Sequence, residues 1–210
     1  MIEYLCMKIV SVISQAIADI HIINYQRFSD TRGYFTEIYN FRDISDIKTL
    51  STSIFVQYNE SFSRKNTVRG LHFQWNPFMG KLVRTIQGHM IDIILDIRPK
   101  SKTFGKAIMC DMPSTSIDEN GQWLWIPPGF AHGNYFIQNT IIEYFCTGTY
   151  NAGCEMGINP FSQDIDWSLA HKDLYDQFAK LQTKCVLSPK DRNGIDLADW
   201  LHNKNSQLFI

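Results

Sequence analysis

Two histidines stand in segments whose composition could support proton transfer on a small molecule. His72 lies within Val68–Gln74, and His132 lies within Pro127–Asn134. Arg69 places a fixed cation three residues before His72, and a guanidinium presents a fork of donors that suits phosphate oxygens. A base beside an anion-binding group suggests proton chemistry on a phosphorylated small molecule.

Each histidine also has a purely structural interpretation. His72 could be a satisfied strand histidine, but Gln74 would share its strand face, and a polar face inside a small barrel is costly unless it binds something. Phe73, on the opposite face, should fill the core. His132 could cap a turn of a loop rich in proline and glycine, although the stiffness of such a loop also suits a positioned ligand group.

Metal binding is a third interpretation, because many β-barrel oxygenases use two histidines and a carboxylate. The usual His-x-His pair is absent here, and Lys81 lies where a carboxylate ligand would be expected. A cation at that place opposes a divalent ion. Lys81 and Tyr144, each unremarkable alone, combine with His72 into a cation, an acid and a base. That set fits deprotonation beside a carbonyl, where the intermediate is an enolate.

The elements that must position these residues are mostly β. Residues 54–59, 81–86 and 141–146 have strand composition, and apolar and charged residues alternate from Met90 to Arg98. Short strands punctuated by Gly, Pro and Asn favour a sandwich or jelly roll. Leu174, Phe178 and Leu181 recur at helical spacing, and residues 196–202 form a second candidate helix, so we expect short helices outside the barrel.

Composition restricts the class of protein. The chain has 210 residues, 44% of them hydrophobic, and a net charge of −1, which predicts one folded domain over residues 1–210 without a basic field for nucleic acid. Its apolar runs are too short to span a membrane. Five scattered cysteines without a Cys-x-x-Cys pair indicate a reduced, cytoplasmic protein. We expect no signal peptide; Met7 is an alternative start, with residues 1–6 as an extension.

Ordered motifs cover nearly the whole chain, from about Met7 to Trp200. They are residues 30–37 (DTRGYFTE), 55–61 (FVQYNES), 69–74 (RGLHFQ), 81–83 (KLV), 96–98 (DIR) with 101–105 (SKTFG), the loop 129–133, and 187–191 (LSPKD). In this order they resemble the nucleotide-sugar epimerases typified by dTDP-4-dehydrorhamnose 3,5-epimerase. The resemblance implies an all-β, cupin-type jelly-roll barrel with short C-terminal helices and the activity of an isomerase.

The resemblance implies four catalytic roles. His72 would be the base that removes the proton from C3, and in full epimerases also from C5, of a 4-keto-6-deoxy sugar. Asp191 would orient the imidazole and stabilise the imidazolium. Lys81 would stabilise the enolate oxygen, and Tyr144 would return a proton to the opposite face of the ring. No metal or redox cofactor is implied.

The resemblance also implies a set of binding residues. Arg69 resembles the diphosphate-binding arginine, and Tyr150 matches the aromatic residue that stacks near the nucleotide base. The other positions that match substrate contacts are Gln57, Asn59, His132, Glu155 and Lys190. In the family, Arg32 and Glu37 reach the site from the neighbouring subunit, which implies a homodimer with exchanged N-terminal strands. Alternatively, Arg32 is a turn residue in a local salt bridge.

The reaction implied is conversion of dTDP-4-dehydro-6-deoxy-D-glucose to dTDP-4-dehydro-L-rhamnose. Alternatives are an epimerase that inverts only C3 or C5, one that uses a CDP- or GDP-linked sugar, and a non-catalytic sugar-nucleotide binding cupin. The sequence departs from the family pattern at Phe78-Met79-Gly80, where a glutamine is usual before the lysine, at Asn134-Tyr135, and in the longer stretch 168–186. These departures leave the sugar, the nucleotide and the number of inverted centres open.

Overall fold

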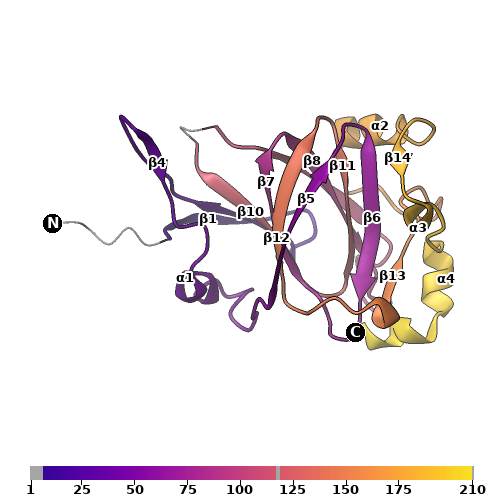
Figure 1. The fold of residues 1–210 in the computed structure, drawn as a ribbon. Coiled ribbons are helices and arrows are strands. Elements are labelled where there is room, and N and C mark those ends of the chain that lie inside the picture. Colours follow the sequence, from indigo (N-terminus) through magenta and orange to yellow (C-terminus); the bar gives the residue numbers. More distant parts are fainter. Residues whose placement is uncertain (1–6, 117–118, 210) are drawn as a thin grey trace.

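The computed structural model describes residues 7–116 and 119–209, so the extension predicted before Met7, residues 1–6, lies outside the described residues. Two antiparallel sheets face each other (Figure 1). The first sheet, in spatial order, is β1 (Ile9–Ser14), β2 (His21–Tyr25), β10 (Gly121–Ile126), β7 (Lys81–Gln87), β12 (Thr140–Cys146) and β5 (Gln57–Ser63). The second is β13 (Glu155–Gly157), β6 (Thr67–Gln74), β11 (Phe130–Phe136), β8 (His89–Asp96) and β9 (Ala107–Pro113), with β14 (Val186–Leu187) parallel to β6.

The core lies on both faces of the second sheet because its inner strand β8 is buried on both sides. Ile91 and Ile93 pack under the C-terminal segment, whereas Ile94 packs between the sheets with Leu124 and Phe130. The alternation predicted for this strand is therefore present, but its polar positions are also buried. The arrangement confirms the predicted all-β jelly roll.

Short helices cover the outer face of the second sheet, on the right in Figure 1. They are α2 (Lys172–Ala179), α3 (Pro189–Arg192), α4 (Leu197–His202) and the 3₁₀ helix η2 (Lys204–Leu208); a shorter 3₁₀ turn, η1 (Ala152–Cys154), precedes β13. Trp200 is fully buried and donates its indole N–H to the carbonyl of Ile97, over 2.8 Å. None of the helices in the described residues has the length and apolar character needed to cross a membrane.

The N-terminal part extends away from the barrel, on the left in Figure 1. It carries the two-stranded hairpin β3 (Phe28–Asp30) and β4 (Gly33–Phe35), followed by α1 (Phe41–Ser45). Two local predictions were wrong. Residues 54–56 precede β5 and are not part of a strand, and His132 lies inside β11 and not in a loop. The Pro-Pro-Gly segment makes only the turn that leads into β11.

Candidate active site

Two cavities meet between the sheets, with volumes of about 380 and 310 Å³. Both are lined by His72, Lys81, His132 and Tyr144. The larger cavity adds Gln57, Asn59, Gln74, Met79, Cys146, Tyr150 and Glu155, among others; the smaller adds Ser61, Arg69, Asn134, Ser188, Lys190 and Asp191, among others. The four shared residues therefore lie where the two cavities meet.

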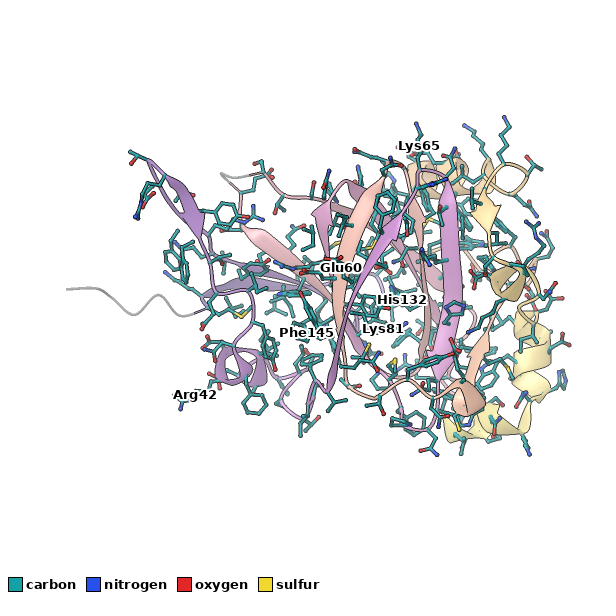
Figure 2. All side chains as sticks on the ribbon, viewed as in Figure 1. Arg42, Glu60, Lys65, Lys81, His132 and Phe145 are labelled. Carbon is teal, nitrogen blue, oxygen red and sulfur yellow. The ribbon has the colours of Figure 1, made fainter. Side chains whose placement is uncertain are left out.

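The strands bring these four residues together from four places in the sequence. His72 on β6 is paired in register with His132 on β11. Lys81 begins β7, and Tyr144 lies on the neighbouring β12 opposite Val83. Figure 2 shows Lys81 and His132 close to each other in the space between the two sheets.

Two glycines make the approach of β6 and β11 possible. Gly70 has a φ of +106°, and a Cβ built on it would lie 2.6 Å from the Cα of Gly133. The pairing register shifts between His132 and Asn134, at Gly133 itself. Only residues without a side chain tolerate such contact, so this pair fixes the bulge that sets His72 opposite His132.

His72 is held by a carboxylate. Its Nε2 lies 2.6 Å from Oδ1 of Asp191, which is buried at the start of α3. Burial alone would raise the pKa of Asp191, but hydrogen bonds with His72 and with Ser188 outweigh it and hold the pKa below its ordinary value. The ionised carboxylate accepts a hydrogen bond from Nε2–H, so that Nδ1 of His72 is the nitrogen that can act as a base.

Gly157 leaves the space that the imidazole ring of His72 occupies. Gly157 on β13 is paired with His72, and a Cβ at this position would lie 3.2 Å from Cδ2 of the imidazole. Any larger residue would push the ring away from its place beside Asp191. Sequence analysis missed this residue, because the β6–β13 pairing joins segments far apart in the chain.

Lys81 belongs to a second, more deeply buried group. Its Nζ lies 3.3 Å from Nδ1 of His132, and Nε2 of His132 lies 2.6 Å from Oδ1 of Asp92. We assign the ring proton to Nε2, which faces Asp92, so that Nδ1 accepts from the lysine. Burial lowers the pKa of Lys81 and of His132 and raises that of Asp92. His132 is therefore a neutral imidazole at neutral pH, and its Nδ1 holds the Lys81 side chain in place.

Asp92 is a further residue that sequence analysis missed as part of the site. It is fully buried, and Asn134 donates to its other oxygen over 3.1 Å. The only signal in the sequence is an aspartate in an otherwise apolar stretch of β8.

Tyr144 lines both cavities and is half-buried. Burial raises the pKa of its phenol above the ordinary value, so the hydroxyl keeps its proton at neutral pH. It can therefore donate a proton inside the cavity.

Polar groups at the mouth of the larger cavity are joined to one another. Gln57 accepts a hydrogen bond from the backbone N–H of Tyr150 over 2.9 Å and donates to Asn59 over 3.1 Å. The Tyr150 hydroxyl donates to Glu155 over 3.0 Å, and Lys190 contacts the same carboxylate oxygen at 2.6 Å. These five predicted binding residues thus form one connected set, four of them lining the larger cavity and Lys190 lining the smaller.

Gln57, Asn59 and Ser61 form a row on the inward face of β5 that runs from the larger cavity to the smaller one. Arg69 follows at the far end of this row. It donates to the hydroxyl of Ser63 over 2.8 Å and to the carbonyl of Phe62 over 3.2 Å. Its guanidinium is anchored at the edge of the smaller cavity.

Arg32 and Glu37 line neither cavity in the described part of this chain. Arg32 lies in the β3–β4 turn, its side chain is 88% exposed, and it pairs with Asp30 at 2.5 Å. Glu37 accepts hydrogen bonds from the backbone N–H of Met7 and from the side chain of Asn40. Within one chain, Arg32 thus makes the local salt bridge that was the alternative interpretation.

Comparison with known proteins identifies the family. The family model described as dTDP-4-dehydrorhamnose 3,5-epimerase matches residues 14–199. The chain belongs to this family. The resemblance seen in the sequence is confirmed, and the protein is an isomerase with a cupin-type jelly roll.

Individual family members support this assignment over most of the chain. The dTDP-4-dehydrorhamnose 3,5-epimerase of Escherichia coli strain K12 is 36% identical over 200 residues, which cover 92% of this chain and 98% of that protein. The enzyme of the same name from Sinorhizobium fredii is 41% identical over 148 residues, or 69% of this chain and 73% of the relative. A crystal structure of a dTDP-6-deoxy-D-glucose-3,5-epimerase from Legionella pneumophila, in complex with dTDP-4-keto-L-rhamnose, superposes with a TM-score of 0.77 at 31% identity, covering 95% and 96% of the two chains.

Proposed function

We propose that this epimerase, acting as one domain, inverts C3 and C5 of dTDP-4-dehydro-6-deoxy-D-glucose to give dTDP-4-dehydro-L-rhamnose. One observation carries the proposal. A base backed by an ionised carboxylate, His72 with Asp191, shares one cavity with a protonated phenol, Tyr144, and an oriented ammonium group, Lys81. Deprotonation beside a ketone requires these three groups, and the ketone of the substrate already acidifies the C–H bond.

The steps balance without a redox partner. Nδ1 of His72 takes the proton from C3, and the electron pair of the C–H bond forms the enolate, whose negative charge lies on O4. Lys81 donates a hydrogen bond to that oxygen, and Asp191 stabilises the imidazolium that has formed. Tyr144 then gives its proton to the opposite face of C3, and solvent exchange restores the phenol and the imidazole. The same sequence at C5 completes the reaction.

The remaining residues bind the substrate in this proposal. Arg69 contacts the diphosphate, where a forked donor set suits phosphate oxygens. Tyr150 stacks near the base, and Gln57, Asn59, His132, Glu155 and Lys190 supply polar contacts along the cavity. A cytoplasmic location stays a prediction from the sequence.

Proton NMR of the substrate with the purified protein in heavy water tests the reaction. We expect deuterium at both C3 and C5 with the native protein and none with His72→Ala. His89→Ala is the matched control, because His89 also contacts an aspartate, Asp111, but lies outside both cavities. Exchange at one carbon would show a one-centre epimerase, and no exchange by folded protein would overturn the proposed reaction.

We also propose that the site is completed across a homodimer, with Arg32 and Glu37 of each subunit reaching the cavity of the other. The β3–β4 hairpin, which carries Arg32 in its turn, projects from the barrel in Figure 1, where a second copy can meet it. Large apolar side chains are exposed in the same region: Val10, Val12, Ile13, Tyr34 and Phe35. A protein surface seldom leaves such a group uncovered.

Subunit complementation tests the shared site. His72→Ala and Arg32→Ala proteins are each expected to be nearly inactive, and mixing them after partial unfolding should form hybrid dimers with one intact site. About a quarter of the native activity per chain is expected for equal, random mixing of a two-fold dimer. No recovery, together with a monomer in analytical ultracentrifugation, would contradict the exchange of residues while leaving the NMR test of the reaction unaffected.

A further inference from the structure

The turn between β6 and β7, residues 75–80, forms one wall of the larger cavity. Met79 lines that cavity, and Lys81 follows directly as the first residue of β7. Trp75 and Phe78 pair as an isolated antiparallel bridge across the turn, so the segment is a closed loop between two strands. Its position therefore decides where the Met79 wall stands.

Gln74 holds this turn from the inside. Its side-chain nitrogen donates to the carbonyls of Pro77 and Thr149, over 2.9 and 3.0 Å, and its oxygen accepts from the backbone N–H of Asn151 over 2.7 Å. The amide is thus occupied by protein backbone on both of its ends. It ties the turn to the segment that carries Tyr150, and the polar group expected on the His72 face has a positioning role.

Phe209, near the C-terminus, holds the same turn from the outside. Its ring centroid lies 5.2 Å from that of Phe78, 5.9 Å from that of Phe73 and 5.6 Å from that of Trp200, with interplanar angles of 73° to 84°. Phe209 is 4% exposed, whereas Phe78 is 42% exposed. Phe209 is therefore buried in the core, and the turn is attached to it through the partly exposed ring of Phe78.

Lys81 has a separate attachment. The backbone N–H of Gly80 donates to the Thr147 hydroxyl over 2.7 Å, and the backbone N–H of Thr147 donates to the carbonyl of Gly80 over 3.0 Å. This pair fixes the end of the turn to the loop after β12. A shift of the turn can therefore move Met79 while leaving Lys81 in place.

We propose that Phe209 is a positioning residue of the substrate pocket: through Phe78 it holds the Met79 wall and so sets substrate affinity more than the rate of proton transfer. The contact is direct, since the ring of Phe209 packs against Phe78 in the turn that carries Met79. The kinetic readout rests on the proposed function; the structural readout given below does not.

Four single variants and one double variant test the proposal on the full chain. Phe209→Ala and Phe78→Ala should each raise KM for the nucleotide sugar by about tenfold and change kcat by less than about threefold, which matches the loss of roughly one aromatic pair. Leu208→Ala is the matched control, because Leu208 is the neighbouring residue, is 47% exposed and should leave KM unchanged. The Phe78→Ala/Phe209→Ala double variant should raise KM no further than the single variants, because both remove the same contact.

Hydrogen exchange of the peptide that spans residues 75–80 gives a readout that needs no substrate. Exchange should be faster in both phenylalanine variants than in the native protein and in Leu208→Ala, and Phe209→Leu should restore most of the protection. Phe78→Ala covers the case in which Phe209→Ala fails to fold, because Phe78 lies at the surface. Native exchange and native KM in folded Phe78→Ala would overturn the proposal, whereas an inactive native protein would count only against the proposed reaction.

Discussion

His72 and His132 face each other on neighbouring strands, yet each contacts a different carboxylate. His72 is partly exposed to the cavity and is paired with the ionised Asp191. His132 is buried between Asp92 and Lys81, where burial lowers its pKa. The same side chain on adjoining strands therefore has two surroundings: His72 lies at the cavity beside an ionised carboxylate, which suits its proposed role as a base, and His132 is buried beside a lysine.

Asp191→Asn should lower kcat/KM by roughly 10²–10⁴, the range for the loss of an effective general base, because the neutral amide cannot stabilise the imidazolium. The protein should remain folded, since an amide fits the same space. Asp111→Asn, which alters the His89 partner outside the cavity, should keep native kinetics. Native activity in Asp191→Asn would show that His72 needs no charged partner.

Gly157→Ala should lower kcat by about tenfold, because the new Cβ would lie 3.2 Å from Cδ2 of His72 and must displace the ring by a few tenths of an ångström. Gly153→Ala is the control, since its Cβ would meet only the side-chain oxygen of Asn151, at 3.4 Å. Steady-state kinetics with circular dichroism would check both variants. An unchanged kcat in folded Gly157→Ala would mean that the ring has room to spare.

Asp92→Asn should move the alkaline limb of the kcat profile to lower pH. The charge of Asp92 favours the ammonium form of Lys81 and partly opposes the burial that lowers the pKa of this lysine. Without that charge, Lys81 loses its proton at lower pH and the enolate loses its counter-charge. A pH profile of kcat at saturating substrate measures the shift. An alkaline limb at the native pH would show that the charge of Asp92 does not affect the pKa of Lys81.

Asp96→Asn should cost about 1–3 kcal/mol of unfolding free energy, as expected when buried hydrogen bonds lose their charged acceptor while Arg98 keeps Asp19 as a partner. Burial would raise the pKa of Asp96, but hydrogen bonds from Arg98, Ser101 and Thr103 outweigh it and lower that pKa below 3.8. A lowered pKa stabilises the fold above pH 3.8, and that stability is lost as pH falls through the folded value. Urea unfolding across this range should show a steeper acid decline in the native protein than in Asp96→Asn.

Much of the site could be predicted because its residues stand in recognisable local motifs. Strand composition predicted β7 and β12, which carry Lys81 and Tyr144, and helical spacing predicted α2. His132 was misplaced because two prolines and a glycine favour a loop, whereas the pairing of β11 with β6 and β8 extends the strand through it. Tertiary pairing overrode the local preference.

Asp92 and Gly157 could not have been found in the same way. Asp92 looks like one polar position of an alternating strand, and its partner His132 comes from another strand. Gly157 matters only because β13 lies beside β6, a pairing between segments with no local signal for each other. Residues that act by leaving space become visible only when the neighbour that fills the space is known.

The row of Gln57, Asn59 and Ser61 connects the two cavities along one wall, while His72 stays fixed where they meet. In the proposed reaction, a substrate held by its diphosphate would exchange one amide or hydroxyl partner for the next as its sugar ring turns. C3 and C5 would then reach the imidazole of His72 in succession without any rearrangement of the barrel. The number of inverted centres would then depend on the residence time of the substrate. A substrate released before its sugar ring turns would have one centre inverted, and one that stays bound would have two.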